Sequence, residues 1–204
     1  ARKDSRFKTV HDVIAEAKKR PLNVSVTRIP HPGSIGMLAL ADATGAKFNL
    51  IPYGGGNPAV TAVANGEAEL GAGGTSGVPN EMGGVFKVLC IFNRTANQLA
   101  SLNENAPLVN QALGTKLPDL YSCRSWAVHN SWIEANPESF KLLKETAAKV
   151  FTMPSFKEAI SKTTTPWECI KYSDQATCTE YALGLIEIAQ RYKSVLTAKK
   201  RPGA

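Results

Sequence analysis

The feature that most constrains the fold is a strand–loop–helix pattern in which each loop carries glycine. Stretches rich in β-branched and other apolar residues at 23–29, 47–53 and 68–72 predict strands, each followed by a glycine-containing loop. The segment 87–92 is predicted as a fourth strand, and 121–128 is a further candidate. Strands that alternate with helices predict an α/β fold with a mainly parallel sheet flanked by helices.

The predicted helices begin at residues that favour helix starts. Thr9 precedes a stretch with an apolar face, and Asn57 is predicted to cap a second helix that has Pro58 in its first turn. Further helices are predicted from Pro137, from Pro154 and from about Asp174, and these make the C-terminal part of the chain helical.

Composition and charge narrow the class of protein. The chain has 204 residues, 43% of them hydrophobic and 20% charged, which suits one full domain or two small lobes. No stretch is apolar for long enough to predict a membrane-spanning helix, and no signal peptide is recognisable in the N-terminal residues. The net charge of +7 is scattered, and no aromatic residues interleave with a basic stripe. This pattern argues against nucleic-acid binding and favours a mild attraction for small anions.

The three glycine loops predict an anion-binding site. Backbone N–H groups at the start of a helix lack helical partners, and the positive end of the helix dipole favours a carboxylate or phosphate there. Taken alone, the first loop, residues 32–36, is better explained as an ordinary capped turn between a strand and a helix. Three such loops at the carboxyl ends of parallel strands would meet at the edge where open α/β sheets bind ligands. The candidate ligand-binding residues are His31, Pro32, Gly33, Ser34, Ile35, Tyr53, Gly54, Gly55, Gly56, Asn57, Thr75 and Ser76.

Motifs that would indicate an enzyme are missing from the sequence. The phosphate-binding loop motif of nucleotide hydrolases does not occur, and residues 74–78 depart from a nucleophile elbow at Val78. No histidine or cysteine spacing predicts a metal site. The sequence therefore predicts binding without catalysis, with no catalytic residues, no metal and no cofactor.

Two cysteines flank a predicted turn into the last helix. Cys169 and Cys178 are close enough in sequence for a disulfide in an oxidising compartment, although spacing alone does not establish the geometry.

Several segments together resemble one family of receptors. Residues 7–18, 32–34, 51–56 and 65–70, with Pro58-Ala59-Val60, resemble the solute-binding receptors of tripartite tricarboxylate transporters, the Bug or TctC-like family. The stretch Ile51-Pro52-Tyr53-Gly54-Gly55-Gly56 is the most specific part, and the resemblance covers about residues 6 to 195.

The resemblance implies a periplasmic-binding-protein-like, two-lobed fold of the flytrap type. It also implies a bacterial periplasmic receptor that captures a small carboxylate (a di- or tricarboxylate or an aromatic acid) and delivers it to membrane transporter subunits. Residues 1–122 would form the ligand-binding lobe two, and residues 123–204 would return to an incomplete lobe one. No nucleic acid and no membrane insertion are expected.

The sequence also departs from this family. Whole receptors of this family begin with a segment of lobe one that has no counterpart in this sequence. Residues 71–74 stand where the family usually has an aspartate and an aromatic residue. Two alternatives therefore stay open. One is a truncated or degenerate relative that acts as an interaction or oligomerising protein. The other is an α/β enzyme that acts on an anionic substrate.

Overall fold

A small parallel sheet organises the N-terminal part of the molecule. The computed structural model describes residues 1–74, 84–93, 100–101, 103–120, 123–163 and 165–197. Its three strands are β1 (Leu22–Val26), β2 (Phe48–Pro52) and β3 (Leu70–Ala72), all parallel and in the order β2-β1-β3. Val26 pairs with Pro52 on one side and with Ala72 on the other, so all three strands end side by side.

Helices cover both faces of this sheet. The helices α1 (Val10–Lys19) and α2 (Pro32–Thr44) share one apolar core with Val24 and Val26 of β1. The helix α3 (Gly56–Ala64) covers the opposite face, where Ser25 Oγ donates a hydrogen bond of 2.8 Å to Ala59 O. Successive strand residues point to opposite faces of the sheet, so Val24 and Val26 face α1 and α2 while Ser25 faces α3. The α/β fold predicted from the sequence is confirmed.

The helix starts follow the sequence with one exception. Thr9 caps α1, as predicted, and forms a reciprocal capping box with Asp12. Asn57 does not cap α3: the cap is Gly55, and Asn57 is the second residue of the helix. Gly54 adopts a left-handed φ of 75°, which turns the chain early enough for the helix to begin at Gly56.

The predicted fourth strand does not form. Ile91 makes an isolated parallel bridge with Leu108, and Lys87 N–H bonds to Ala1 O rather than to the sheet. Pro107, next to the bridge, has no N–H to donate and so interrupts any longer ladder. The short helix α4 (Val109–Leu113) follows directly. Residues 123–128 are also not a strand, while 121 and 122 lie outside the described residues.

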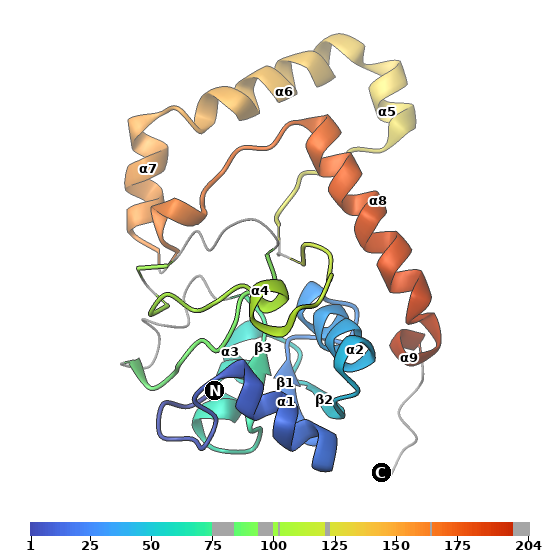
Figure 1. Ribbon diagram of the computed structural model, residues 1–204. Helices are drawn as coiled ribbons and strands as arrows, with labels where there is room; N and C mark the ends of the chain where they lie inside the picture. Colours follow the sequence, from blue (N-terminus) through green and yellow to red (C-terminus); the bar gives the residue numbers. More distant parts are fainter. Residues whose placement is uncertain (75–83, 94–99, 102, 121–122, 164, 198–204) are drawn as a thin grey trace.

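Residues 123–197 form a C-terminal arm built mainly from helices. Its elements are α5 (Asn130–Ala135), α6 (Pro137–Val150), α7 (Pro154–Ser161), the 3₁₀ turn η2 (Trp167–Cys169), α8 (Gln175–Arg191) and α9 (Lys193–Thr197). Figure 1 shows α5, α6 and α7 arching away from the sheet, while α8 returns toward α2. We call residues 1–120 the sheet unit and residues 123–197 the arm.

Candidate functional site

The carboxyl edge of the sheet brings the predicted loops together. Tyr53 N–H, directly after β2, donates a hydrogen bond of 3.0 Å to Val26 O at the end of β1. A Cβ placed on Gly33, in the first turn of α2, would lie 2.7 Å from Ala72 O at the end of β3. Glycine is therefore required where the first loop touches the third. Thr75 and Ser76, also predicted as ligand-binding, lie outside the described residues.

The first loop is held by its own side chains. His31 caps α2, and its Nδ1 accepts a hydrogen bond of 3.1 Å from Gly33 N–H. Burial, with a smaller effect from the Arg28 charge, lowers the pKa of His31. Both effects favour the neutral imidazole, which is the form that can accept at Nδ1.

Two predicted residues of this loop serve its construction. The Ser34 side chain is fully buried, and its hydroxyl donates a hydrogen bond of 2.6 Å to Arg28 O. Ile35 belongs to the apolar core. Pro32 has no N–H. The Ser34 backbone N–H makes no hydrogen bond with any described residue, and the whole residue is buried.

The second loop leaves a helix start uncapped. Gly55, the cap residue of α3, makes no side-chain hydrogen bond, and no described residue accepts from the N–H groups of Gly56 and Asn57. A Cβ placed on Gly54 or Gly56 would meet nothing within 4 Å, so the space over this turn is open. Tyr53 turns its hydroxyl toward Glu67 Oε2, at 3.5 Å. Partial burial, followed by the Glu67 charge, raises the pKa of Tyr53.

Sequence reasoning missed Arg28. This exposed side chain follows β1 by two residues and is close enough to His31 to lower its pKa. It forms no ion pair within the described part of the chain. Arg28 falls within the strand predicted at 23–29, but β1 ends at Val26 in the structure, so no pattern in the sequence indicates its place in the loop.

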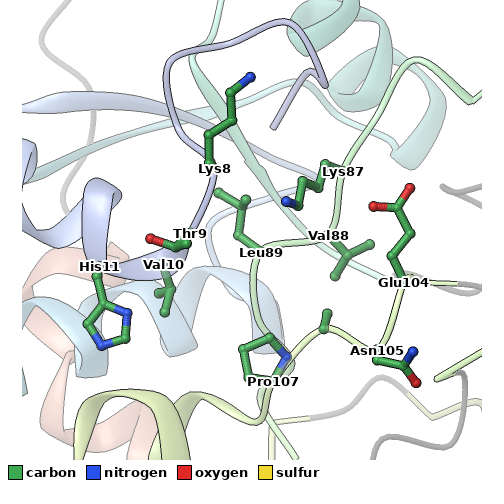
Figure 2. A pocket seen from close by; sticks show the side chains of 11 residues that line it. Lys8, Thr9, Val10, His11, Lys87, Val88, Leu89, Glu104, Asn105 and Pro107 are labelled. Carbon is green, nitrogen blue, oxygen red and sulfur yellow. The ribbon is translucent and has the colours of Figure 1, made fainter.

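A separate hollow lies elsewhere on the sheet unit. Figure 2 shows this cavity of about 250 Å³ beside the start of α1. Glu104 pairs with Lys3 at 3.0 Å, and Lys8 Nζ donates to Lys3 O, so both of these charged residues of the lining have partners. None of the predicted ligand-binding residues lines this cavity; its lining is Lys8, Thr9, Val10, His11, Lys87, Val88, Leu89, Glu104, Asn105, Ala106 and Pro107.

The described residues offer no metal site and, at Cys90, no reactive thiol. They contain no cluster of three metal-ligating side chains, and no helix among them has the length and apolar character to cross a membrane. Cys169 and Cys178 are free thiols in the structure, and their pairing under oxidising conditions stays a prediction. Burial raises the pKa of the Cys90 thiol to about 12, so this cysteine stays protonated at neutral pH.

The fold is shared with a solved structure. No family model matches the chain, and no curated protein matches it. A crystal structure of a TctC solute-binding protein from Polaromonas, determined without ligand, superposes with a TM-score of 0.69 at 21% sequence identity. The match covers 96% of this chain and 64% of that chain, so this chain spans less than two thirds of the matched protein's length. The predicted periplasmic-binding-protein-like fold is confirmed.

Proposed function

We propose that this chain is a solute-binding receptor of the TctC type that captures a small carboxylate at the carboxyl edge of its sheet. The observation that carries this proposal is the uncapped start of α3, which opens at the edge where all three strands end. The fold shared with a solute-binding protein supports it.

Electrostatics at this edge suits a carboxylate. The N-termini of α2 and α3 both lie there, and each contributes a partial positive charge. The N–H groups of Gly56 and Asn57 on α3 add donors without partners among the described residues. Arg28 adds a full positive charge nearby. The neutral His31 accepts at Nδ1 and therefore carries its proton on Nε2, which leaves a second donor.

The described part of the edge favours binding over reaction. The Ser34 hydroxyl is buried and committed to Arg28 O, and the His31 Nδ1 is committed to the helix cap. A nucleophile needs an adjacent base to activate it, and neither of these groups is free for that role. We therefore propose a receptor rather than an enzyme.

The finer features of the proposal rest on the sequence resemblance. They are a periplasmic location, a di- or tricarboxylate or aromatic acid as ligand, and delivery to membrane transporter subunits. They also include the division into a ligand-binding lobe at residues 1–122 and a return to lobe one at residues 123–204. Binding at the uncapped start of α3 can be tested directly on this chain.

The test is calorimetric titration of the chain with citrate, succinate and benzoate, alongside Gly56→Ala. The added methyl group enters open space over the first turn of α3, so the variant should fold normally and obstruct an anion there. We expect Gly56→Ala to raise Kd about tenfold, since losing one or two hydrogen bonds to a charged group costs at least about 1.4 kcal/mol.

Gly184→Ala is the matched control, because Gly184 lies on α8 and its added Cβ also meets nothing within 4 Å. This variant should bind as the unmodified chain does. Absence of heat and of thermal stabilisation with all three acids at millimolar concentration would contradict the proposal. Binding that is equally strong in Gly56→Ala would move the ligand away from α3.

A further inference from the structure

The loops at the carboxyl edge of the sheet carry a single full charge among their described residues. These residues are 27–35, 53–57 and 73–74, and Arg28 is the one lysine, arginine, aspartate or glutamate in them. Its guanidinium is exposed and forms no ion pair within the described part of the chain. A cation without a partner at this edge favours a ligand that brings a negative charge to it.

The strand order places the Arg28 loop between the other two. β1 is the middle strand of the order β2-β1-β3. On one side, Tyr53 N–H donates a hydrogen bond of 3.0 Å to Val26 O, and on the other a Cβ placed on Gly73 would lie 3.8 Å from Thr27 Oγ1. Arg28 therefore follows the point at which both neighbouring loops contact the end of β1.

Hydrogen bonds hold the backbone at Arg28 beside the start of α2. The buried Ser34 hydroxyl donates a hydrogen bond of 2.6 Å to Arg28 O, and His31 N–H donates one of 2.9 Å to Ile29 O. The exposed side chain of Arg28 is thus attached to a fixed backbone, which limits where its guanidinium can reach.

His31 offers a donor in the same place. Burial and, to a smaller extent, the Arg28 charge lower the pKa of His31, so the two side chains lie within electrostatic reach of each other. Since Nδ1 accepts from Gly33 N–H, the proton of the neutral ring is on Nε2. Arg28 and His31 therefore make a group of donors after β1, separate from the N–H groups of α3 after β2.

We propose that Arg28, together with His31 Nε2, binds a second carboxylate of the ligand, so that the site selects short dicarboxylates over monocarboxylates. The inference rests on the proposed capture of a first carboxylate at the start of α3. A guanidinium matches a carboxylate with two parallel N–H bonds, and neighbouring strands are only about 4.8 Å apart, so a short carbon chain can join the two carboxylates.

The test is calorimetric titration with succinate and with succinamate, which has the same carbon chain but a neutral amide in place of one carboxylate. We expect the unmodified chain to bind succinate about tenfold more tightly or better, because a charge-assisted hydrogen bond is lost with the amide. Arg28→Gln should reduce this preference to about twofold, the statistical advantage of two equivalent carboxylates. It should do so by weakening succinate while leaving succinamate unchanged. Arg28→Lys, which keeps the charge but not the two parallel donors, should give an intermediate preference.

Lys47→Gln is the matched control. It removes the same charge from an exposed side chain that has no ion pair among the described residues, but Lys47 precedes β2 at the opposite edge of the sheet. This variant should keep the full preference for succinate. Because Arg28 and Lys47 are both exposed, neither glutamine variant should change the melting temperature.

The possible failures are distinguishable. Equal affinity of the unmodified chain for succinate and succinamate would overturn this inference and leave the capture of a carboxylate standing. A preference that survives in Arg28→Gln, or one that is lost equally in Lys47→Gln, would overturn the role of Arg28. Absence of binding for both compounds, and for citrate and benzoate, would contradict the proposed function and this inference together.

Discussion

The sheet unit and the arm are built by different means. In the sheet unit, α1, α2 and all three strands meet in one apolar core, with residues such as Leu22 and Val24 fully buried. In the arm, only Tyr192 is buried among the described residues. The arm nevertheless contains the longest helix in the described part of the chain, α8.

Local signals explain how the arm can be helical without a core. Asp174 accepts a hydrogen bond from Thr177 N–H and caps α8, while Pro137 and Pro154 stand at the first positions of α6 and α7. Such caps determine where helices start but supply little burial energy. Helix boundaries and tertiary stability are therefore set by separate parts of the sequence.

The sharpest way to test this contrast is a leucine truncation in each region. Leu40 on α2 is 2% exposed, and Leu40→Ala should lower the free energy of unfolding by about 2–5 kcal/mol through lost burial and a cavity. Leu142→Ala on α6 should change it by less than about 0.5 kcal/mol. Urea denaturation measures both. Similar losses in the two variants would show that the arm has a core of its own.

A pair of glycine substitutions tests how closely the edge of the sheet unit is packed. Gly33→Ala should destabilise by about 1–3 kcal/mol, because its Cβ would collide with the Ala72 backbone. Gly56→Ala should be neutral to within about 0.5 kcal/mol, since its Cβ meets open space. Thermal unfolding compares them. An unchanged melting temperature for Gly33→Ala would mean that Gly33 and the Ala72 backbone lie further apart than the structure shows.

The contact between the arm and the sheet unit can be weakened by removing the Tyr192 hydroxyl. Tyr192 Oη donates a hydrogen bond of 2.8 Å to Asp42 Oδ2 on α2. Tyr192→Phe should cost about 1 kcal/mol. Hydrogen exchange should become faster in the C-terminal half of α8 while β1 keeps its protection. Equal acceleration in both would indicate that arm and sheet unit open together.

The smallest expected effect is a pH dependence from His31. Its pKa is lowered in the folded state, so the unfolded state binds more protons at mildly acidic pH. The contribution of the neutral cap is fully present above the unfolded pKa, about 6.5, and is lost as pH falls below it. Because His31 is only half buried, we expect less than about 1 kcal/mol.

His31→Asn keeps a capping side chain but removes this titration. Urea unfolding at about pH 7.5 and about pH 5 should show a smaller pH-dependent loss for the variant than for the unmodified chain. An identical loss in both would assign the pH dependence to other groups.

The sequence predicted the parts of the fold that local patterns specify. The three strands, the Thr9 and Asp174 caps and the glycine loops at one sheet edge followed from periodicity and capping. The strand predicted at 87–92 was wrong because apolar periodicity does not reveal that Lys87 pairs with the N-terminal residues.

At the candidate site, the sequence indicated where ligand-binding loops gather but not what each side chain does there. Ser34 was predicted to contact the ligand, but it is buried and its hydroxyl donates a hydrogen bond to Arg28 O. His31 was a candidate contact and caps α2, while Arg28 went unnoticed. These roles depend on which groups the tertiary fold brings within hydrogen-bond distance, which no pattern along the chain records.

The Tyr192–Asp42 hydrogen bond joins residues 150 positions apart. Most of the core contacts of the sheet unit join residues that leave the ribosome long before Tyr192 is made. We therefore expect the sheet to assemble first and the arm to dock last. Closing so long a loop is entropically costly, and the contact with Asp42 can form only after α2 has folded. A newly made chain would then carry a formed carboxyl edge before its C-terminal helix arrives.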